Sequence, residues 1–242
     1  MQHKSIDGLH VVCVHGAGAG GWEWGIWART LNVRGFGVIA PDLMPAAAGV
    51  VATQFADYRK QVLAWCSATT APPVLVGASL GGLLALSVAA EIRPAALILV
   101  NPVPPLGVAG GLVRTWPALV AWSRTRSRAG TRGSIPDADD AARMYAYRRW
   151  RDESGAVLNA AQRGIAIDVP TCRMLVLASA DDRDVPCATT RALAGLLGAD
   201  FEKIAGASHV GPLLGRSAPT VASRVCDWLA ALPSPGADLT AP

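Results

Sequence analysis

The chain has 242 residues, of which 51% are hydrophobic and 17% charged, and a formal net charge of +4. This length allows one sizeable buried core, so we expect a single domain over residues 1–242. The two long uncharged stretches, 61–90 and 94–113, are interrupted by prolines and glycines, which excludes an uninterrupted membrane-spanning helix. The first residues do not show a basic segment followed by an apolar one, so we expect no secretory signal. The five cysteines are scattered without C-x-x-C spacing, and we therefore expect a soluble cytoplasmic protein.

The positive charge is concentrated in one segment. Residues 106–167 contain ten arginines and five acidic residues, whereas the rest of the chain has 12 basic and 13 acidic residues. A solvated helical face accounts for such a pattern, but the segment would also attract an anionic substrate or an acidic acyl carrier protein. No nucleic-acid recognition motif accompanies it, so we expect no nucleic-acid partner.

Apolar runs alternate with helix-like segments along most of the chain. The expected strands cover 11–14, 38–40, 74–77, 97–100, 174–178 and 201–204, and the expected helices cover 24–34, 53–67, 80–92, 189–197 and 220–232. Continuous apolar runs are typical of parallel strands that are covered on both faces. The pattern therefore predicts an α/β fold with a mostly parallel, doubly wound sheet and a site at the C-terminal edge of its strands.

The alternation stops in the middle of the chain. Residues 103–167 are rich in arginine and tryptophan and helical in character, and we expect them to form a small helical lid over that edge of the sheet. The last ten residues, 233–242, are rich in proline and alanine, and we expect them to be disordered.

The pentapeptide Gly77-Ala78-Ser79-Leu80-Gly81 stands between an expected strand and an expected helix. This is the G-x-S-x-G pattern of a nucleophile elbow, in which glycines permit a reversal that a Cβ atom would block. An ordinary glycine-rich turn with a surface serine has the same local signature. The pentapeptide alone does not decide between the two.

Three further segments favour the catalytic interpretation. The segment His15-Gly16-Ala17-Gly18 follows a strand, and its small residues suit a backbone N–H that binds an oxyanion. Residues 180–186 contain three aspartates just past a strand, and His209 lies in a loop after the last expected strand. The order serine, acid, histidine is that of serine hydrolases with an α/β sheet, and it leaves His209 as the base and Ser79 as the nucleophile.

These residues resemble the α/β-hydrolase superfamily across nearly the whole chain. Residues 14–24 and 40–43 look most like the methylesterase and hydroxynitrile lyase branch and its bacterial relatives. The resemblance implies that Ala17 and Leu80 provide the oxyanion N–H groups. It also implies that the acid stands four residues before a proline, which selects Asp182 and leaves Asp181 as the second choice. Neither a cofactor nor a metal is implied.

Departures from that branch narrow the reaction. Hydroxynitrile lyases carry a lysine after the histidine and usually a cysteine after the serine, whereas this chain has Val210 and Leu80. We therefore do not expect cyanohydrin cleavage. Because the nucleophile is Ser79, we do not expect the aspartate chemistry of haloalkane dehalogenases or epoxide hydrolases either.

Aromatic and apolar residues near these segments are candidates for the substrate pocket, since ligand sites are mostly apolar. Packing in the core is the alternative for each tryptophan. The candidates are Trp22, Trp24, Trp116, Trp122 and Val210.

Three functions are compatible with this sequence. The first is hydrolysis of an ester, thioester or lactone of a small to medium, partly apolar and possibly anionic molecule through a Ser79 acyl-enzyme. The second is a lyase of the same fold, for example one that eliminates acetate in polyketide or tetronate tailoring. The composition, rich in alanine, arginine and glycine, is typical of GC-rich bacteria, where the resemblance implies such roles in secondary metabolism. The third, a binding module without activity, would show a broken triad.

Overall fold

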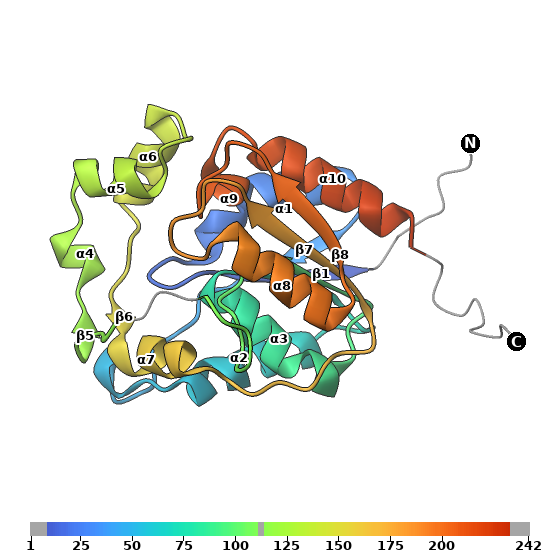
Figure 1. Cartoon of the computed structure of the whole chain (residues 1–242), viewed down its shortest axis with the longest axis horizontal. Helices are drawn as coiled ribbons and strands as arrows, with labels where there is room; N and C mark the ends of the chain where they lie inside the picture. Colours follow the sequence, from blue (N-terminus) through green and yellow to red (C-terminus); the bar gives the residue numbers. More distant parts are fainter. Residues whose placement is uncertain (1–8, 111–113, 233–242) are drawn as a thin grey trace, which may run out of the picture.

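The computed structural model describes residues 9–110 and 114–232 and contains a six-stranded parallel sheet (Figure 1). Its strand order is β2-β1-β3-β4-β7-β8, and every neighbouring pair is parallel. The strands are β1 (His10–Val14), β2 (Gly37–Ile39), β3 (Val74–Ala78), β4 (Ala96–Val100), β7 (Arg173–Ser179) and β8 (Asp200–Ile204). The predicted α/β fold with a parallel sheet is confirmed, and its six strands are those expected.

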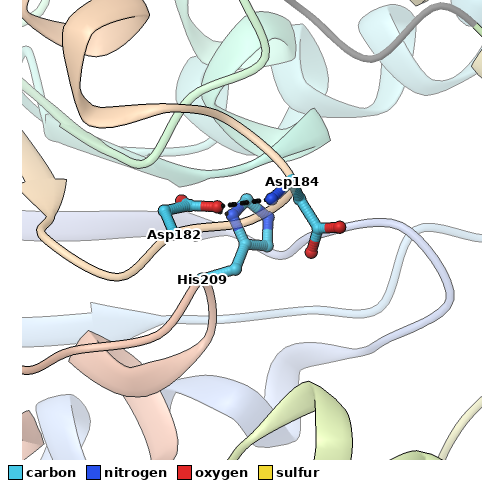
Figure 2. A group of neighbouring side chains, drawn as sticks. All are labelled: Asp182, Asp184 and His209. Carbon is cyan, nitrogen blue, oxygen red and sulfur yellow. Dashed lines mark hydrogen bonds and ion pairs between the residues drawn. The ribbon is translucent and has the colours of Figure 1, made fainter.

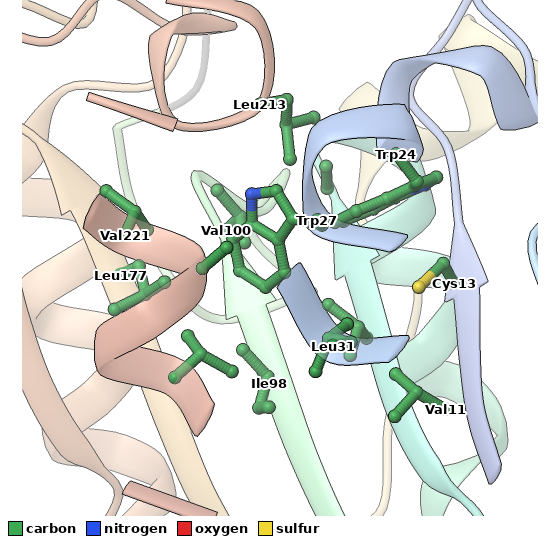
Figure 3. Packing of buried hydrophobic residues seen from close by; sticks show 14 of the residues in the cluster. Val11, Cys13, Trp24, Trp27, Leu31, Ile98, Val100, Leu177, Leu213 and Val221 are labelled. Carbon is green, nitrogen blue, oxygen red and sulfur yellow. The ribbon is translucent and has the colours of Figure 1, made fainter. Parts of the chain in front are cut away.

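Helices cover both faces of the sheet because successive strand residues point to opposite sides. Val11 and Cys13 of β1 belong to one buried cluster, together with residues of α1 (Gly25–Val33) and α10 (Ala218–Ala230) (Figure 3). Val12 and Val14 belong to a second cluster on the other face. That face is covered by α2 (Phe55–Ser67), α3 (Leu80–Ile92) and α8 (Cys187–Leu197).

Helix ends differ from the expected ones by a few residues. The expected helix 24–34 is a 3₁₀ turn, η1 (Gly21–Trp24), followed by α1. The expected helix 53–67 begins at Phe55, because Gln54 caps it and its N–H donates to the Asp57 carboxylate at 2.8 Å. A second 3₁₀ turn, η2 (Val50–Ala52), precedes α2, and the short helix α9 (Gly211–Leu214) precedes α10.

The segment between β4 and β7 forms a layer beside the C-terminal edge of the sheet, drawn in green and yellow in Figure 1. It contains α4 (Trp122–Thr125), α5 (Arg128–Ser134), α6 (Asp140–Tyr147) and α7 (Gly155–Arg163). We call this segment, 103–167, the lid. It also contains an antiparallel pair of two-residue strands, β5 (Leu119–Val120) and β6 (Glu153–Ser154), which were not predicted. Strands this short carry no readable periodicity.

Among residues 9–110 and 114–232, no helix is long and apolar enough to cross a membrane. The expected disordered tail, 233–242, lies outside the described residues.

Candidate active site

Ser79 lies at the sharp turn between β3 and α3. Its backbone has φ 53° and ψ −120°, a conformation that non-glycine residues rarely adopt and that is typical of strained functional positions. A Cβ atom on Gly77 would collide with the backbone of Gly81, and one on Gly81 would collide with the carbonyl oxygens of Val14 and His15. The predicted reason for the two glycines is confirmed, and the turn presents Ser79 at the edge of the sheet.

A hydrogen-bonded chain joins the three predicted catalytic side chains. His209 Nε2 lies 2.8 Å from Ser79 Oγ, and His209 Nδ1 lies 2.7 Å from Asp182 Oδ2. In the neutral tautomer that this arrangement requires, Ser79 donates to Nε2 and Nδ1–H donates to Asp182. Asp182 is the acid in contact with the histidine, whereas Asp181 is exposed and hydrogen-bonds through its backbone N–H to the carbonyl of Ala207.

The Asp182 carboxylate is itself held in place. Its side chain is 0% exposed. Its second oxygen, Oδ1, accepts a hydrogen bond from the backbone N–H of Asp184 (Figure 2) and another from that of Val185, both at 2.8 Å. Three donors therefore face one buried carboxylate. This arrangement fixes the plane of the His209 ring.

The environment raises the pKa of His209 above its usual value. Burial acts in the opposite direction and lowers this pKa, but the hydrogen bond and negative charge of Asp182 outweigh it, with smaller contributions from Asp184 and Glu23. A base with a raised pKa is a better acceptor for the serine proton and must be deprotonated before it acts.

Two residues that the sequence did not single out hold the loop that carries His209. Asn101, at the end of β4, is 1% exposed and has φ 45°; its Nδ2 donates to the carbonyl oxygen of His209 at 2.7 Å. Asp137 of the lid accepts hydrogen bonds from the N–H and the hydroxyl of Ser208, at 3.2 and 2.5 Å. A single polar residue after a strand, such as Asn101, or between two lid helices, such as Asp137, gives no sequence signal of these contacts.

The loop of residues 15–18, which we call the oxyanion loop, presents three successive N–H groups. Gly16 N–H donates to Glu23 Oε2 and Gly18 N–H donates to Glu153 Oε2, both at 3.1 Å. In the described part of the chain, neither Ala17 N–H nor Leu80 N–H has a hydrogen-bond acceptor. Ala17 and Leu80 line the same cavity as Ser79, so their N–H groups remain available for a substrate oxygen.

His15 supports this loop as a neutral ring. Its Nδ1 lies 2.8 Å from the carbonyl oxygen of Gly16, and its Nε2 accepts a hydrogen bond from Leu43 N–H at 2.8 Å. Burial lowers the pKa of His15 to about 4, so the ring stays uncharged at neutral pH. His15 has a structural place and does not compete with His209 as a base.

A cavity of about 760 Å³ opens above Ser79, between the sheet edge and the lid. Of the five predicted pocket residues, Trp116, Trp122 and Val210 line it, and the two tryptophan rings contact each other edge to face at 5.6 Å. Three lid arginines also line it. They are Arg114, Arg126 and Arg163.

Trp22 and Trp24 do not line this cavity, and the prediction for these two residues is wrong. Trp24 is 0% exposed and packs against Trp27 at 5.3 Å inside the core cluster (Figure 3). Trp22 packs edge to face on Tyr145 and Trp150 of the lid. In the turn η1, the side chain between the two tryptophans, Glu23, faces the cavity. The Trp24 ring therefore points into the core and the Trp22 ring points to the lid.

One group of side chains also has the composition of a metal site. Ligand atoms of Asp182, Asp184 and His209 lie within 4.8 Å of one another. Both ring nitrogens of His209 are already engaged, one with Asp182 (Figure 2) and the other with Ser79. The cluster is therefore explained by its contacts within the protein, and the residues present do not call for an ion.

Several solved structures have a similar fold. Among solved structures, the chain is similar to a methylesterase from Arabidopsis, with 14% identity over 93% of this chain and 100% of that one and a TM-score of 0.71. It is also similar to polyneuridine aldehyde esterase (17% identity, 92% and 99% covered, TM-score 0.70). A monoacylglycerol lipase from Paleococcus ferrophilus has 20% identity, 92% and 94% coverage and a TM-score of 0.65.

At these identities the structural likeness shows the fold alone. A search of the curated proteins found no match. The model of the alpha/beta hydrolase family matches residues 11–223, which include the serine, the aspartate and the histidine described above. The chain belongs to the alpha/beta hydrolase family and is a hydrolase-type enzyme of that family.

Proposed function

We propose that the protein hydrolyses carboxylic esters, or the related thioesters and lactones, through an acyl-enzyme on Ser79. The observation that carries this proposal is the continuous hydrogen-bonded chain from Ser79 through His209 to Asp182. Ser79 lines a cavity together with Ala17 and Leu80, whose N–H groups have no acceptor among residues 9–110 and 114–232. A serine that can lose its proton to a fixed base, beside donors for an oxyanion, is the requirement for acyl transfer.

The residues would act in the following order. Ser79 Oγ attacks the ester carbonyl carbon while its proton passes to His209 Nε2, and the carbonyl oxygen becomes an oxyanion facing Ala17 N–H and Leu80 N–H. Collapse of this intermediate breaks the bond to the leaving group, which takes the proton from His209. Water then attacks the acyl-enzyme, again with His209 as base, and releases the acid and free Ser79. Asp182 stabilises the charged imidazole in both steps.

The walls of the cavity support an apolar substrate that carries a negative charge. Trp116 and Trp122 provide apolar surface, and Arg114 stacks over the Trp116 ring at 4.1 Å. Arg126 and Arg163 line the same cavity. Because three cations line one cavity, an anionic ester is the preferred substrate class of this proposal, and a thioester on an acidic carrier protein is the other source of the same charge.

The first experiment tests the nucleophile. Purified protein is incubated with a fluorophosphonate and its intact mass is measured, with Ser79→Ala as the matched control. We expect one adduct on the wild type and none on the variant. A folded wild type that shows no adduct, or equal rates of p-nitrophenyl acetate hydrolysis by the two proteins, would contradict the acyl-enzyme.

Elimination of a carboxylate is the second candidate, because the cavity arginines would also stabilise a departing carboxylate. Turnover in oxygen-18 water separates the two reactions. Hydrolysis through the acyl-enzyme places one labelled oxygen in the released acid, whereas elimination releases an acid that contains only its original oxygens.

A further inference from the structure

A second carboxyl group lies in the catalytic cavity. Glu23 belongs to η1 and is 3% exposed, yet it lines the cavity together with Ser79, Ala17 and His209. Its position is close to the nucleophile: a Cβ atom built on Gly16 would lie 3.4 Å from Ser79 Cβ and 3.7 Å from Glu23 Oε2. Glu23 and Ser79 therefore both approach Gly16 on the wall of one cavity.

The two oxygens of Glu23 have different surroundings. Oε2 accepts the hydrogen bond from Gly16 N–H at 3.1 Å, and the Glu23 side chain makes no other hydrogen bond among residues 9–110 and 114–232. Oε1 is not one of the fully buried polar atoms without a partner, so part of its surface is open to the cavity that Glu23 lines. An oxygen that faces a substrate cavity and has no protein partner is a position for a substrate atom.

The protonation state decides what Oε1 can do there. Burial raises the pKa of Glu23 to about 7, although the Gly16 hydrogen bond and the charge of His209 act to lower it. Other charged side chains on this cavity are Asp184, Arg114, Arg126 and Arg163. A negative Glu23 would oppose the oxyanion that forms nearby, whereas a neutral carboxyl would offer a hydrogen-bond donor.

We propose that Glu23 contacts the substrate in its protonated form and donates a hydrogen bond from Oε1 to an oxygen of the acyl group. This proposal rests on the proposed acyl transfer at Ser79. It assigns a substrate class, namely esters whose acyl chain carries an acceptor oxygen beside the scissile carbonyl. Deprotonation of Glu23 removes the donor and places a negative charge beside the developing oxyanion.

A matched pair of substrates tests the contact. The acyl groups of p-nitrophenyl methoxyacetate and p-nitrophenyl butyrate have nearly the same shape and differ by an ether oxygen in place of a methylene. The ratio of their kcat/KM values, measured on one protein, cancels differences in enzyme concentration. Intrinsic reactivity cancels when the ratio is compared between wild type and Glu23→Met, which has similar length and no donor. We expect the ratio to fall about fivefold in the variant, as for loss of one neutral hydrogen bond.

The pH profile provides a second test that a purely structural role would not affect. In the wild type the rate on methoxyacetate falls as pH rises through the pKa of Glu23. In Glu23→Gln, which keeps an amide donor and an acceptor for Gly16 N–H, this fall disappears and the rate stays level above pH 8.

Several results would overturn the proposal. They are an unchanged substrate ratio in Glu23→Met, or the same alkaline fall in wild type and Glu23→Gln. If Glu23→Met does not fold, the substrate-ratio test is replaced by carbon-13 NMR of the wild-type protein with labelled glutamate carboxyls. The Glu23 signal is assigned by comparison with Glu23→Gln. A Glu23 carboxyl that titrates in the usual acidic range would overturn the proposal. Failure of fluorophosphonate labelling at Ser79 would instead contradict the proposed function, so the two failures are distinguishable.

Discussion

Replacement of Glu153 by glutamine tests how the lid positions the oxyanion loop. Glu153 is 3% exposed and accepts three hydrogen bonds: from Gly18 N–H at 3.1 Å, from the Tyr58 hydroxyl at 2.9 Å and from Ser154 N–H at 2.8 Å. The last two reach Oε1 and the first reaches Oε2. A glutamine has one acceptor oxygen, which takes the Oε1 position because two donors face it, so its amide nitrogen faces Gly18 N–H.

The magnitude follows from the loss of that one contact. A hydrogen bond to a charged group contributes about 1.5–3 kcal/mol, so we expect Glu153→Gln to lose about 2 kcal/mol of stability. For a chain of this size that corresponds to a melting temperature roughly 4–8 °C lower. Because Ala17 stands next to Gly18, its N–H also loses alignment. Removal of one oxyanion donor costs on the order of 10²–10³ in kcat, and we expect a partial loss of about tenfold to a hundredfold.

The assay combines thermal unfolding with kcat on p-nitrophenyl acetate, and Tyr58→Phe is the matched control. This control removes a hydrogen bond to the same carboxylate and leaves the Gly18 contact in place. It should lose a similar amount of stability, about 2 kcal/mol, and keep the wild-type kcat. Equal kcat values for Glu153→Gln and Tyr58→Phe would refute the view that Glu153 positions the oxyanion loop.

Three further predictions concern the catalytic chain and its turn. Asp182→Asn should lower kcat by about 10⁴, since the amide favours the wrong histidine tautomer, and Asp181→Asn should leave kcat unchanged; steady-state rates on p-nitrophenyl acetate compare the two. Since the pKa of His209 is raised and the base must be neutral, kcat/KM should fall as pH decreases, with a midpoint above 6.5; a lower midpoint in the wild type would contradict the geometry. Gly77→Ala should prevent stable folding, because its Cβ would meet the backbone of Gly81; a soluble variant with the wild-type melting temperature would argue against that.

Local backbone requirements explain what was predictable about the site. Gly77 and Gly81 are needed where the chain reverses, and this need is visible in the sequence as a pattern between a strand and a helix. The parallel sheet then brings segments that follow strand ends to one edge, so the order of Ser79, Asp182 and His209 was sufficient to place them together. The structure joins these three side chains by hydrogen bonds, and their catalytic roles stay predictions for the experiments above.

The tryptophans show where sequence reasoning failed. Trp22 and Trp24 were expected in the pocket because they lie near the oxyanion loop, but the turn η1 directs Trp24 into the core and Glu23 into the cavity. Neighbouring residues of a short turn point in different directions, so a shift of one position along η1 changes which side chain is buried in the core. Hydrophobicity alone does not decide that direction.

The amino-acid sequence by itself determined the α/β sheet, the turn that carries Ser79 and the order of the catalytic residues, because each depends on apolar runs and glycines that are neighbours in the chain. Only the tertiary structure decided the surroundings of that site. Glu153 meets Gly18 across 135 residues, and Asn101 meets His209 across 108. Such contacts depend on how the lid packs on the sheet, and a single carboxylate or amide in a sequence carries no trace of the N–H group that it will face.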